Sequence, residues 1–147
     1  MTIAPDDLAV LTKLVKEHEG FSPVPYKDTE GLLTIGFGRL IEPDRGGGIS
    51  VSEGELMLAN DLAKCDADLQ GFGWYRGLAG PRKCAVLSMR FQLGATGFRG
   101  FKAMLGHIAD GNWALAAVEA LDSRWAKQTP KRAQAVAAML ENETYPV

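Results

Sequence analysis

The first twenty residues place their hydrophobic side chains at helical spacing. Leu8, Leu11, Leu14 and Val15 fall on one helical face, and Gly20 follows as a residue type that commonly ends a helix. The pattern predicts a helix from about residue 5 to residue 19.

The next thirty residues change to a strand pattern. β-Branched and aromatic residues surround Glu30-Gly31, a turn signal, so residues 26–38 are predicted to form a β-hairpin. A further strand is predicted before the glycine run at residues 46–48. This short region is the only part of the chain with convincing strand patterning.

Helical spacing returns after the glycine run and persists. Ser50 and Glu53 have the spacing of a capping box, in which each side chain binds the other residue's backbone N–H, and a helix of about 20 residues should follow. Residues 81–142 read as further helices. We therefore expect an α+β fold, in which a small N-terminal β-hairpin lobe is joined by a long helix to an all-helical C-terminal lobe.

Length and composition agree with one folded domain. The chain has 147 residues, of which 46% are hydrophobic, and we expect a single domain over residues 1–147. The small α/β lobe with its connecting helix is predicted at about residues 20–70, and the helical lobe at residues 1–19 and 71–147. No signal peptide or membrane-spanning run is seen, so no stable membrane association is expected.

Charge and metal-binding residue types narrow the function classes. Two cysteines and two histidines give no metal-ligand spacing, so neither a metal nor another cofactor is expected. Residues 1–75 carry 6 basic and 13 acidic side chains, whereas residues 76–147 carry 10 basic and 5 acidic ones. The net charge of −2 argues against a dedicated nucleic-acid binder.

Three polar residues could carry chemistry. Glu19 closes the first predicted helix, where the partial negative charge of the helix end favours a carboxyl that keeps its proton, as a general acid must. Asp28 and Thr34 are equidistant from Gly31, so they are expected to face each other across the hairpin, with β-carbons about 5 Å apart, and to hold a water. An acid opposite an activated water can hydrolyse a glycosidic bond. On these residues alone, ordinary surface groups remain the commoner explanation.

Three blocks of sequence resemble one enzyme family. Glu19-Gly20 with residues 26–31 and 33–40, then residues 89–97 with Gly100-Phe101, and finally residues 123–133 are similar to the T-even type bacteriophage lysozymes, glycoside hydrolase family 24. The likeness spans about residues 14–133 in the family's order. It implies a lysozyme-like fold.

The resemblance also implies the reaction and its residues. It implies an endolysin, a muramidase that hydrolyses the β-1,4 bond between N-acetylmuramic acid and N-acetylglucosamine in peptidoglycan with inversion. Glu19 would protonate the leaving oxygen, Asp28 would orient water and stabilise the transition state, and Thr34 would hold the attacking water. Inversion places the two carboxyl groups about 6.5 to 9.5 Å apart.

Supporting positions carry over in the same way. Leu40, Phe91 and Gln92 would line the glycan cleft. Two ion pairs would close the lobes, Glu30 with Arg124 and Arg39 with Asp61. The best-known family members have a histidine at the position of Arg39, and a polar serine and asparagine at the positions of Met104 and Glu119, so the subsites on that side are expected to differ.

The biological setting follows from the same likeness. An endolysin would be a monomer that stays in the host cytoplasm until a separate holin-type pore admits it to the periplasm and cell wall, where peptidoglycan glycan strands are its partner. Three alternatives stay open: a binding module that holds glycan without cutting it, a catalytic domain borrowed by a bacteriocin or tail spike, and a lytic transglycosylase. A transglycosylase uses one acid and no water-positioning pair, which Asp28 and Thr34 disfavour.

Overall fold

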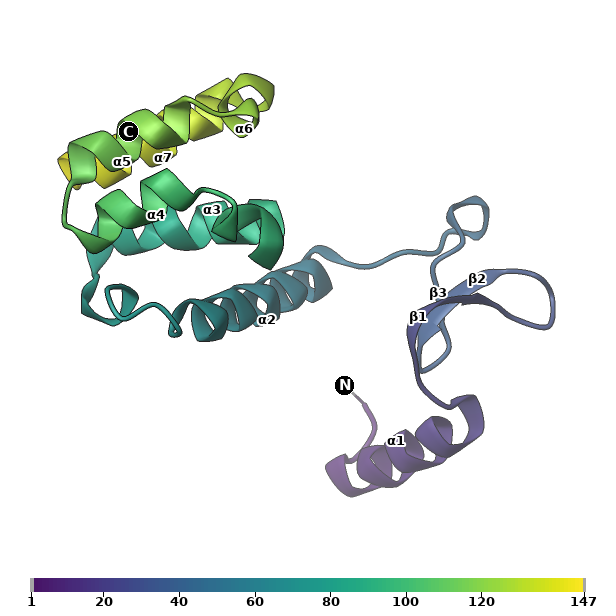
Figure 1. Ribbon diagram of the computed structural model, residues 1–147. Coiled ribbons are helices and arrows are strands. Elements are labelled where there is room, and N and C mark those ends of the chain that lie inside the picture. The colour runs from purple at the N-terminus through teal and green to yellow at the C-terminus, as the bar shows by residue number, and fades with distance from the viewer. Residues whose placement is uncertain (1, 147) are drawn as a thin grey trace. The chain divides into compact units, whose positions relative to one another are not determined.

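The computed structural model describes residues 2–146. Within them the chain forms seven α-helices, two short 3-10 helices and a three-stranded sheet (Figure 1), which confirms the predicted α+β class. Residues 1–55 and 56–147 make two compact units, and each is described by itself. The predicted membership of residues 1–19 in the helical lobe concerns packing between these units and stays a prediction.

The first unit begins with helix α1, Pro5–Glu19, as the apolar spacing predicts. Proline occupies the first turn and Asp6 and Asp7 follow it, which suits the positive end of the helix. The backbone N–H of Gly20 donates to the Lys16 carbonyl at 3.0 Å and ends the helix.

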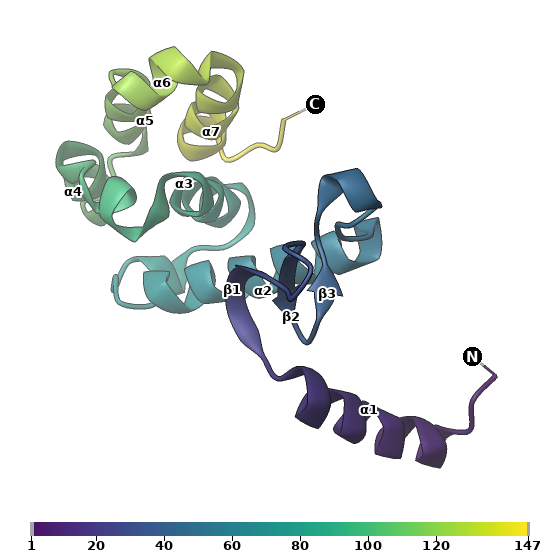
Figure 2. The same ribbon diagram turned by 90° about the vertical axis from the view of Figure 1, so that its right-hand side faces the viewer.

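The sheet follows directly. Strands β1 (Ser22–Lys27), β2 (Leu33–Gly36) and β3 (Arg39–Leu40) pair antiparallel in that order, and Figure 2 shows them side by side. The register of β1 against β2 shifts between Ser22 and Tyr26. This interval contains Pro23 and Pro25, which lack the N–H that a regular ladder requires.

The capping box at Ser50 forms as predicted. A 3-10 turn, Pro43–Arg45, leads to helix α2, Val51–Leu69. The N–H of Glu53 donates to Ser50 Oγ at 3.2 Å, and the N–H of Ser50 donates to Glu53 Oε1 at 2.9 Å. These bonds satisfy two donors that a helix start leaves open.

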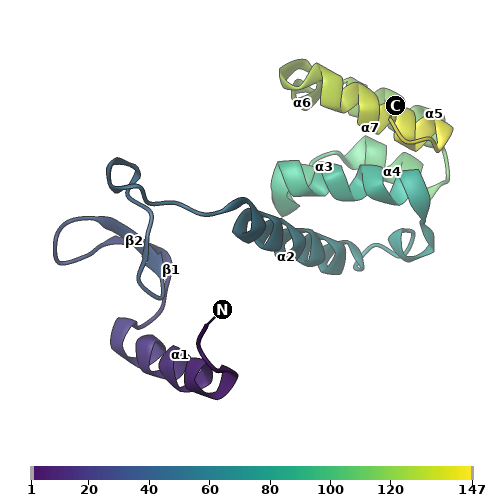
Figure 3. The same cartoon turned by 180° about the vertical axis from the view of Figure 1, so that it is seen from behind.

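The helical unit contains the remaining elements. They are a 3-10 turn at Tyr75–Gly77 and helices α3 (Gly80–Arg99), α4 (Lys102–Ala109), α5 (Trp113–Leu121), α6 (Arg124–Gln128) and α7 (Pro130–Asn142). Figures 1 and 3, taken from opposite sides, show α5, α6 and α7 in one layer, α3 and α4 in a second and α2 beneath them. The sequence predicts helices over residues 81–142, and the observed α3 is interrupted within this range at Gly94, whose φ is 77°.

The core of this unit brings every layer together. Its largest fully buried side chains are Tyr75, Phe98, Leu69, Met89, Met104, Ile108, Leu140 and Val86. The hydroxyl of Tyr75 donates to Asp66 Oδ1 at 2.5 Å, and burial, then this bond, raises the pKa of Tyr75.

Arg82 joins the start of α3 to the end of α7. Its guanidinium donates to the carbonyls of Leu140 (2.8 Å) and Glu141 (3.2 Å) and stacks 4.4 Å from the centre of the Trp113 ring. One side chain therefore satisfies carbonyls that the last turn of α7 would leave open.

Candidate functional site

Glu19 is fixed against a turn of the sheet. Glu19 is the last residue of α1. Its carboxyl packs against Gly38 in the turn between β2 and β3, so closely that a β-carbon at position 38 would stand 2.5 Å from Glu19 Oε2. The rings of Phe21 and Phe37 lie 5.0 Å apart beside this contact, and Lys16 Nζ stands 5.3 Å from the Phe37 ring. A β-carbon at position 38 would therefore displace the acid from this position.

Asp28 is held by the hairpin turn. Its Oδ1 accepts the backbone N–H groups of Glu30 and Leu32, both at 2.9 Å. The N–H of Gly31 donates to the Asp28 carbonyl, and Gly31 has a φ of 79°. These two features define a three-residue hairpin turn whose last residue is glycine. Both side-chain bonds use Oδ1, so Oδ2 can still accept a hydrogen bond from water or a ligand.

Thr34 lies in β2 and is only 5% exposed. Its hydroxyl donates to the Leu32 carbonyl at 3.0 Å, which also accepts the N–H of Asp28 at 2.9 Å. Asp28 and Thr34 are thus joined through one peptide, and the lone pairs of the Thr34 hydroxyl can accept a hydrogen bond from water.

The predicted register of this pair is wrong. Thr34 pairs with Tyr26, not with Asp28, because the turn closes over Thr29, Glu30 and Gly31 and pairs Asp28 with Leu32. Asp28 and Thr34 are diagonal neighbours on one face, with β-carbons roughly 7 Å apart instead of 5 Å. The longer gap still suits two groups that share a water.

Strand β3 adds two further predicted residues to this unit. Leu40 pairs with Thr34 and is half-buried. Arg39 Nη1 forms an ion pair with Glu53 Oε2 at 2.5 Å and donates to the Gly48 carbonyl at 3.3 Å. Hydrogen bonds from the Ser50 backbone and hydroxyl, followed by Arg39, hold the pKa of Glu53 below its usual range.

The other predicted residues belong to the helical unit. Gln92 accepts the indole N–H of Trp125 through Oε1 at 2.8 Å, and Phe91 is 38% exposed beside it in the chain. The predicted pairs Glu30–Arg124 and Arg39–Asp61 each join one unit to the other. They stay predictions, as does the separation of the Glu19 and Asp28 carboxyl groups.

A cleft of about 520 Å³ opens in the helical unit. Leu93, Phe101, Met104 and Trp125 give it an apolar lining, while Glu119 and Arg124 bring both signs of charge. The sequence singles out Met104 and Glu119 as departures from the family pattern, and the structure places both on this cleft. The cleft itself, formed by segments distant in sequence, could not be inferred.

The described residues, 2–146, contain no group of three or more histidine, cysteine, aspartate or glutamate side chains arranged to hold a metal ion. Within the same residues, none of the helices has both the length and the apolar character needed to cross a bilayer.

Comparison with known proteins gives one consistent result. The family model described as Phage lysozyme matches residues 16–142. Probable T4-type lysozyme 2 of Dictyostelium discoideum is 32% identical over 161 residues, which cover 91% of this chain and 95% of that protein. Probable T4-type lysozyme 1 of the same organism is 31% identical over 158 residues, covering 89% and 93%.

A third relative is much longer than this chain. The pre-baseplate central spike protein Gp5 of Enterobacteria phage T4 is 28% identical over 156 residues, which cover 88% of this chain and 27% of that protein. The region matched by the family model, residues 16–142, contains every candidate site residue from Glu19 to Arg124.

Proposed function

The chain belongs to the phage lysozyme family and is a lysozyme-type glycosidase, and we propose that it cuts peptidoglycan between N-acetylmuramic acid and N-acetylglucosamine with inversion. The observation that carries the proposal is the contact of the Glu19 carboxyl with Gly38, in the unit whose hairpin also holds Asp28 in its turn and Thr34 in β2. A proton donor and a water-holding pair are what an inverting glycosidase needs.

In the proposed reaction Glu19 gives its proton to the glycosidic oxygen as the bond to C1 breaks. A water held by the Thr34 hydroxyl attacks C1 from the opposite side, and the carboxylate of Asp28 orients this water, stabilises the positive charge at C1 and accepts the water's proton. The two hydrogen bonds from Glu30 and Leu32 N–H support this role, because they fix the carboxylate before the substrate arrives.

Replacing Glu19 with glutamine tests the acid. The change keeps the size of the side chain and removes its proton, so clearing of outer-membrane-permeabilised Gram-negative cells should slow by roughly 10² to 10⁴-fold. Glu17→Gln is the matched control, because it removes a carboxylate from the same turn of α1 and should clear cells at the wild-type rate. Equal clearing by wild type and Glu19→Gln would reject Glu19 as the acid.

The products separate the enzyme alternatives. Hydrolysis adds one water to each cut, whereas a transglycosylase leaves an anhydro end that is one water lighter, so mass analysis of the released fragments decides between them. A protein that binds cell walls but releases no fragments would be a binding module. Inversion is checked by detecting the α-anomer in the first products by NMR, before mutarotation.

We also propose that the chain acts as an endolysin, held in the host cytoplasm until a holin-type pore opens the membrane. Its family membership supports this setting. Expression in bacteria with and without a separate pore-forming protein tests it: lysis should require the pore. Lysis without the pore would reject the dependence. The similarity to a phage spike protein favours one other setting, a wall-cutting part of the virion, which detection of the chain in purified particles would reveal.

A further inference from the structure

Helix α3 is built as two arms that meet at Gly94. The φ of 77° and ψ of 171° at this residue are not helical, so the first arm ends at Leu93 and the second runs from Ala95 to Arg99. Both arms border the cleft of the helical unit, the first through Leu93 and the second through Gly97. The angle between the arms therefore sets the shape of that cleft.

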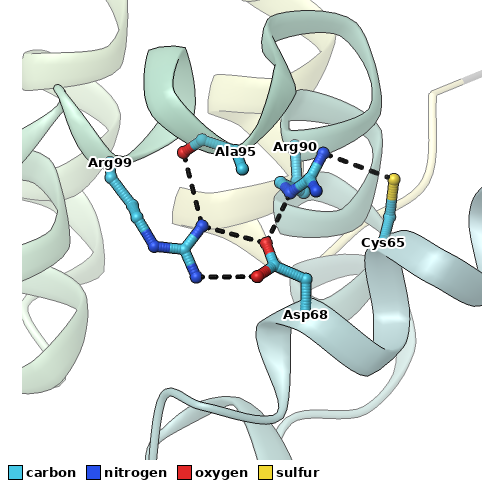
Figure 4. A network of polar contacts seen from close by, with 5 residues as sticks. All are labelled: Cys65, Asp68, Arg90, Ala95 and Arg99. Carbon is cyan, nitrogen blue, oxygen red and sulfur yellow. Dashed lines mark hydrogen bonds and ion pairs between the residues drawn. The ribbon is translucent and has the colours of Figure 1, made fainter.

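One carboxylate of α2 holds both arms. Asp68 Oδ2 accepts Arg90 Nε of the first arm at 2.7 Å and Arg99 Nη1 of the second at 2.9 Å, and Asp68 Oδ1 accepts Arg99 Nη2 at 3.0 Å. Arg99 Nη1 also donates to the Ala95 carbonyl at 3.3 Å. Figure 4 shows the two guanidinium groups reaching this carboxylate from different sides, with Cys65 beyond Arg90.

The contact between Asp68 and Arg90 also constrains the position of Gln92, because Arg90 and Gln92 both lie on the first arm. Two residues along a helix lie about 200° apart around its axis, so Arg90 and Gln92 are on opposite sides of the first arm. Arg90 faces α2, where it meets Asp68 and donates to Cys65 Sγ at 3.6 Å, while Gln92 faces α6 and binds Trp125. Rotation of the arm about its axis would move both contacts together.

We propose that Asp68 is a positioning residue, which fixes the two arms of α3 and thereby the amide of Gln92 and the adjoining wall of the cleft. That Gln92 contacts the glycan rests on the proposed function; that Asp68 sets its position does not. The second arm is also anchored by Phe98, which is fully buried, so loss of the Asp68 bonds should shift the arms without unfolding the unit.

The indole N–H of Trp125 reports on this position without substrate. Its hydrogen bond to Gln92 Oε1 gives it a proton NMR signal that moves when Gln92 moves, and Trp125→Phe identifies that signal by removing it. Asp68→Asn, which weakens the charged bonds, should shift the signal. Arg99→Met removes only the bonds between Asp68 and the second arm, and the Arg99 side chain is 41% exposed. This variant should therefore shift the Trp125 signal less.

Glu143→Gln is the matched control. Glu143 forms another ion pair of the same unit, with Arg82 at 3.3 Å. Arg82 lies in the first turn of α3, so this pair is remote from Gly94, where the two arms meet. The substitution should leave the Trp125 signal in place. An unmoved signal in folded Asp68→Asn, or an equal shift in Glu143→Gln, would overturn the proposal.

Kinetics on soluble, uncrosslinked glycan strands test the consequence for substrate. Because Gln92 would bind ground state and transition state alike, Asp68→Asn should raise KM by about 3 to 10-fold and leave kcat within about twofold. A fall in kcat with unchanged KM would overturn the link to Gln92. If wild type cuts no glycan, the proposed function fails while the NMR measurement still decides the role of Asp68.

Discussion

Replacing Gly38 with alanine tests whether the position of the Glu19 carboxyl matters. The added β-carbon would stand 2.5 Å from Oε2 and 2.8 Å from Cδ of Glu19, whereas ordinary contact begins at 3.4 Å, so the carboxyl must retreat by about 0.9 Å. The carboxyl is the free end of a flexible side chain and can move at little cost. A misplacement of about 1 Å in a catalytic group can cost roughly 10²-fold in rate.

The same substitution also strains the backbone, because the φ of Gly38 is 76° and an alanine there costs about 1–2 kcal/mol. Gly36→Ala separates the two effects. Gly36 has a φ of 66° in the same hairpin, but a β-carbon there meets nothing within 4 Å. Both variants should lose similar stability, and only Gly38→Ala should lose about 10²-fold in activity.

The assay compares rates of cell-wall clearing at a temperature well below both unfolding midpoints, with stability measured by denaturant titration. If Gly38→Ala and Gly36→Ala both clear cell walls at the wild-type rate, the contact with Gly38 does not position the acid. If both variants lose activity equally, backbone strain and not the displaced carboxyl is the cause. Either result would refute the reasoning.

Three further predictions concern charge and stability. Asp28→Asn keeps an Oδ1 acceptor for the turn and should lose activity but little stability, while Asp28→Ala should also unfold about 1–2 kcal/mol more easily in urea. The bonds from Arg99 and then Arg90 lower the pKa of Asp68 to about 2. Wild type should therefore be more stable than Asp68→Asn by about 1–2 kcal/mol above pH 4, and it should lose this advantage as the pH falls through 2. The measurement is the free energy of unfolding of both proteins as a function of pH. Arg82→Met should destabilise the chain by about 1–3 kcal/mol, measured as a lower thermal midpoint, because it leaves carbonyls at the end of α7 without their donor.

Features set by neighbouring residues could be predicted from the sequence. The end of α1 at Gly20 and the capping box of Ser50 and Glu53 depend on residues a few positions apart, and both form as expected. The hairpin was also predictable, but its register was not. A turn signal locates a turn without fixing how many residues it contains, and here the Asp28 side chain selects a three-residue loop.

Features that join distant residues could not be inferred from spacing. Glu19 and Gly38 are both prominent in the sequence, yet only the structure shows that one leaves room for the other. Asp68 gave no sequence signal, because a single carboxylate on a helix is usually a solvated group and its arginines follow 22 and 31 positions later. Periodicity reports which face of an element is apolar, not which element will cover it.

The contacts of Arg82 bear on how the protein is synthesised. This residue, at the start of α3, binds carbonyls that follow it by 58 and 59 positions, and α7 also supplies Leu140 to the core. Helix α7 leaves the ribosome after all the other helices of the unit, so a nascent chain halted before α7 lacks the carbonyls that Arg82 binds and part of the core. The helical unit should therefore mature late in translation, and shortened products that stop before α7 should be readily degraded by proteases.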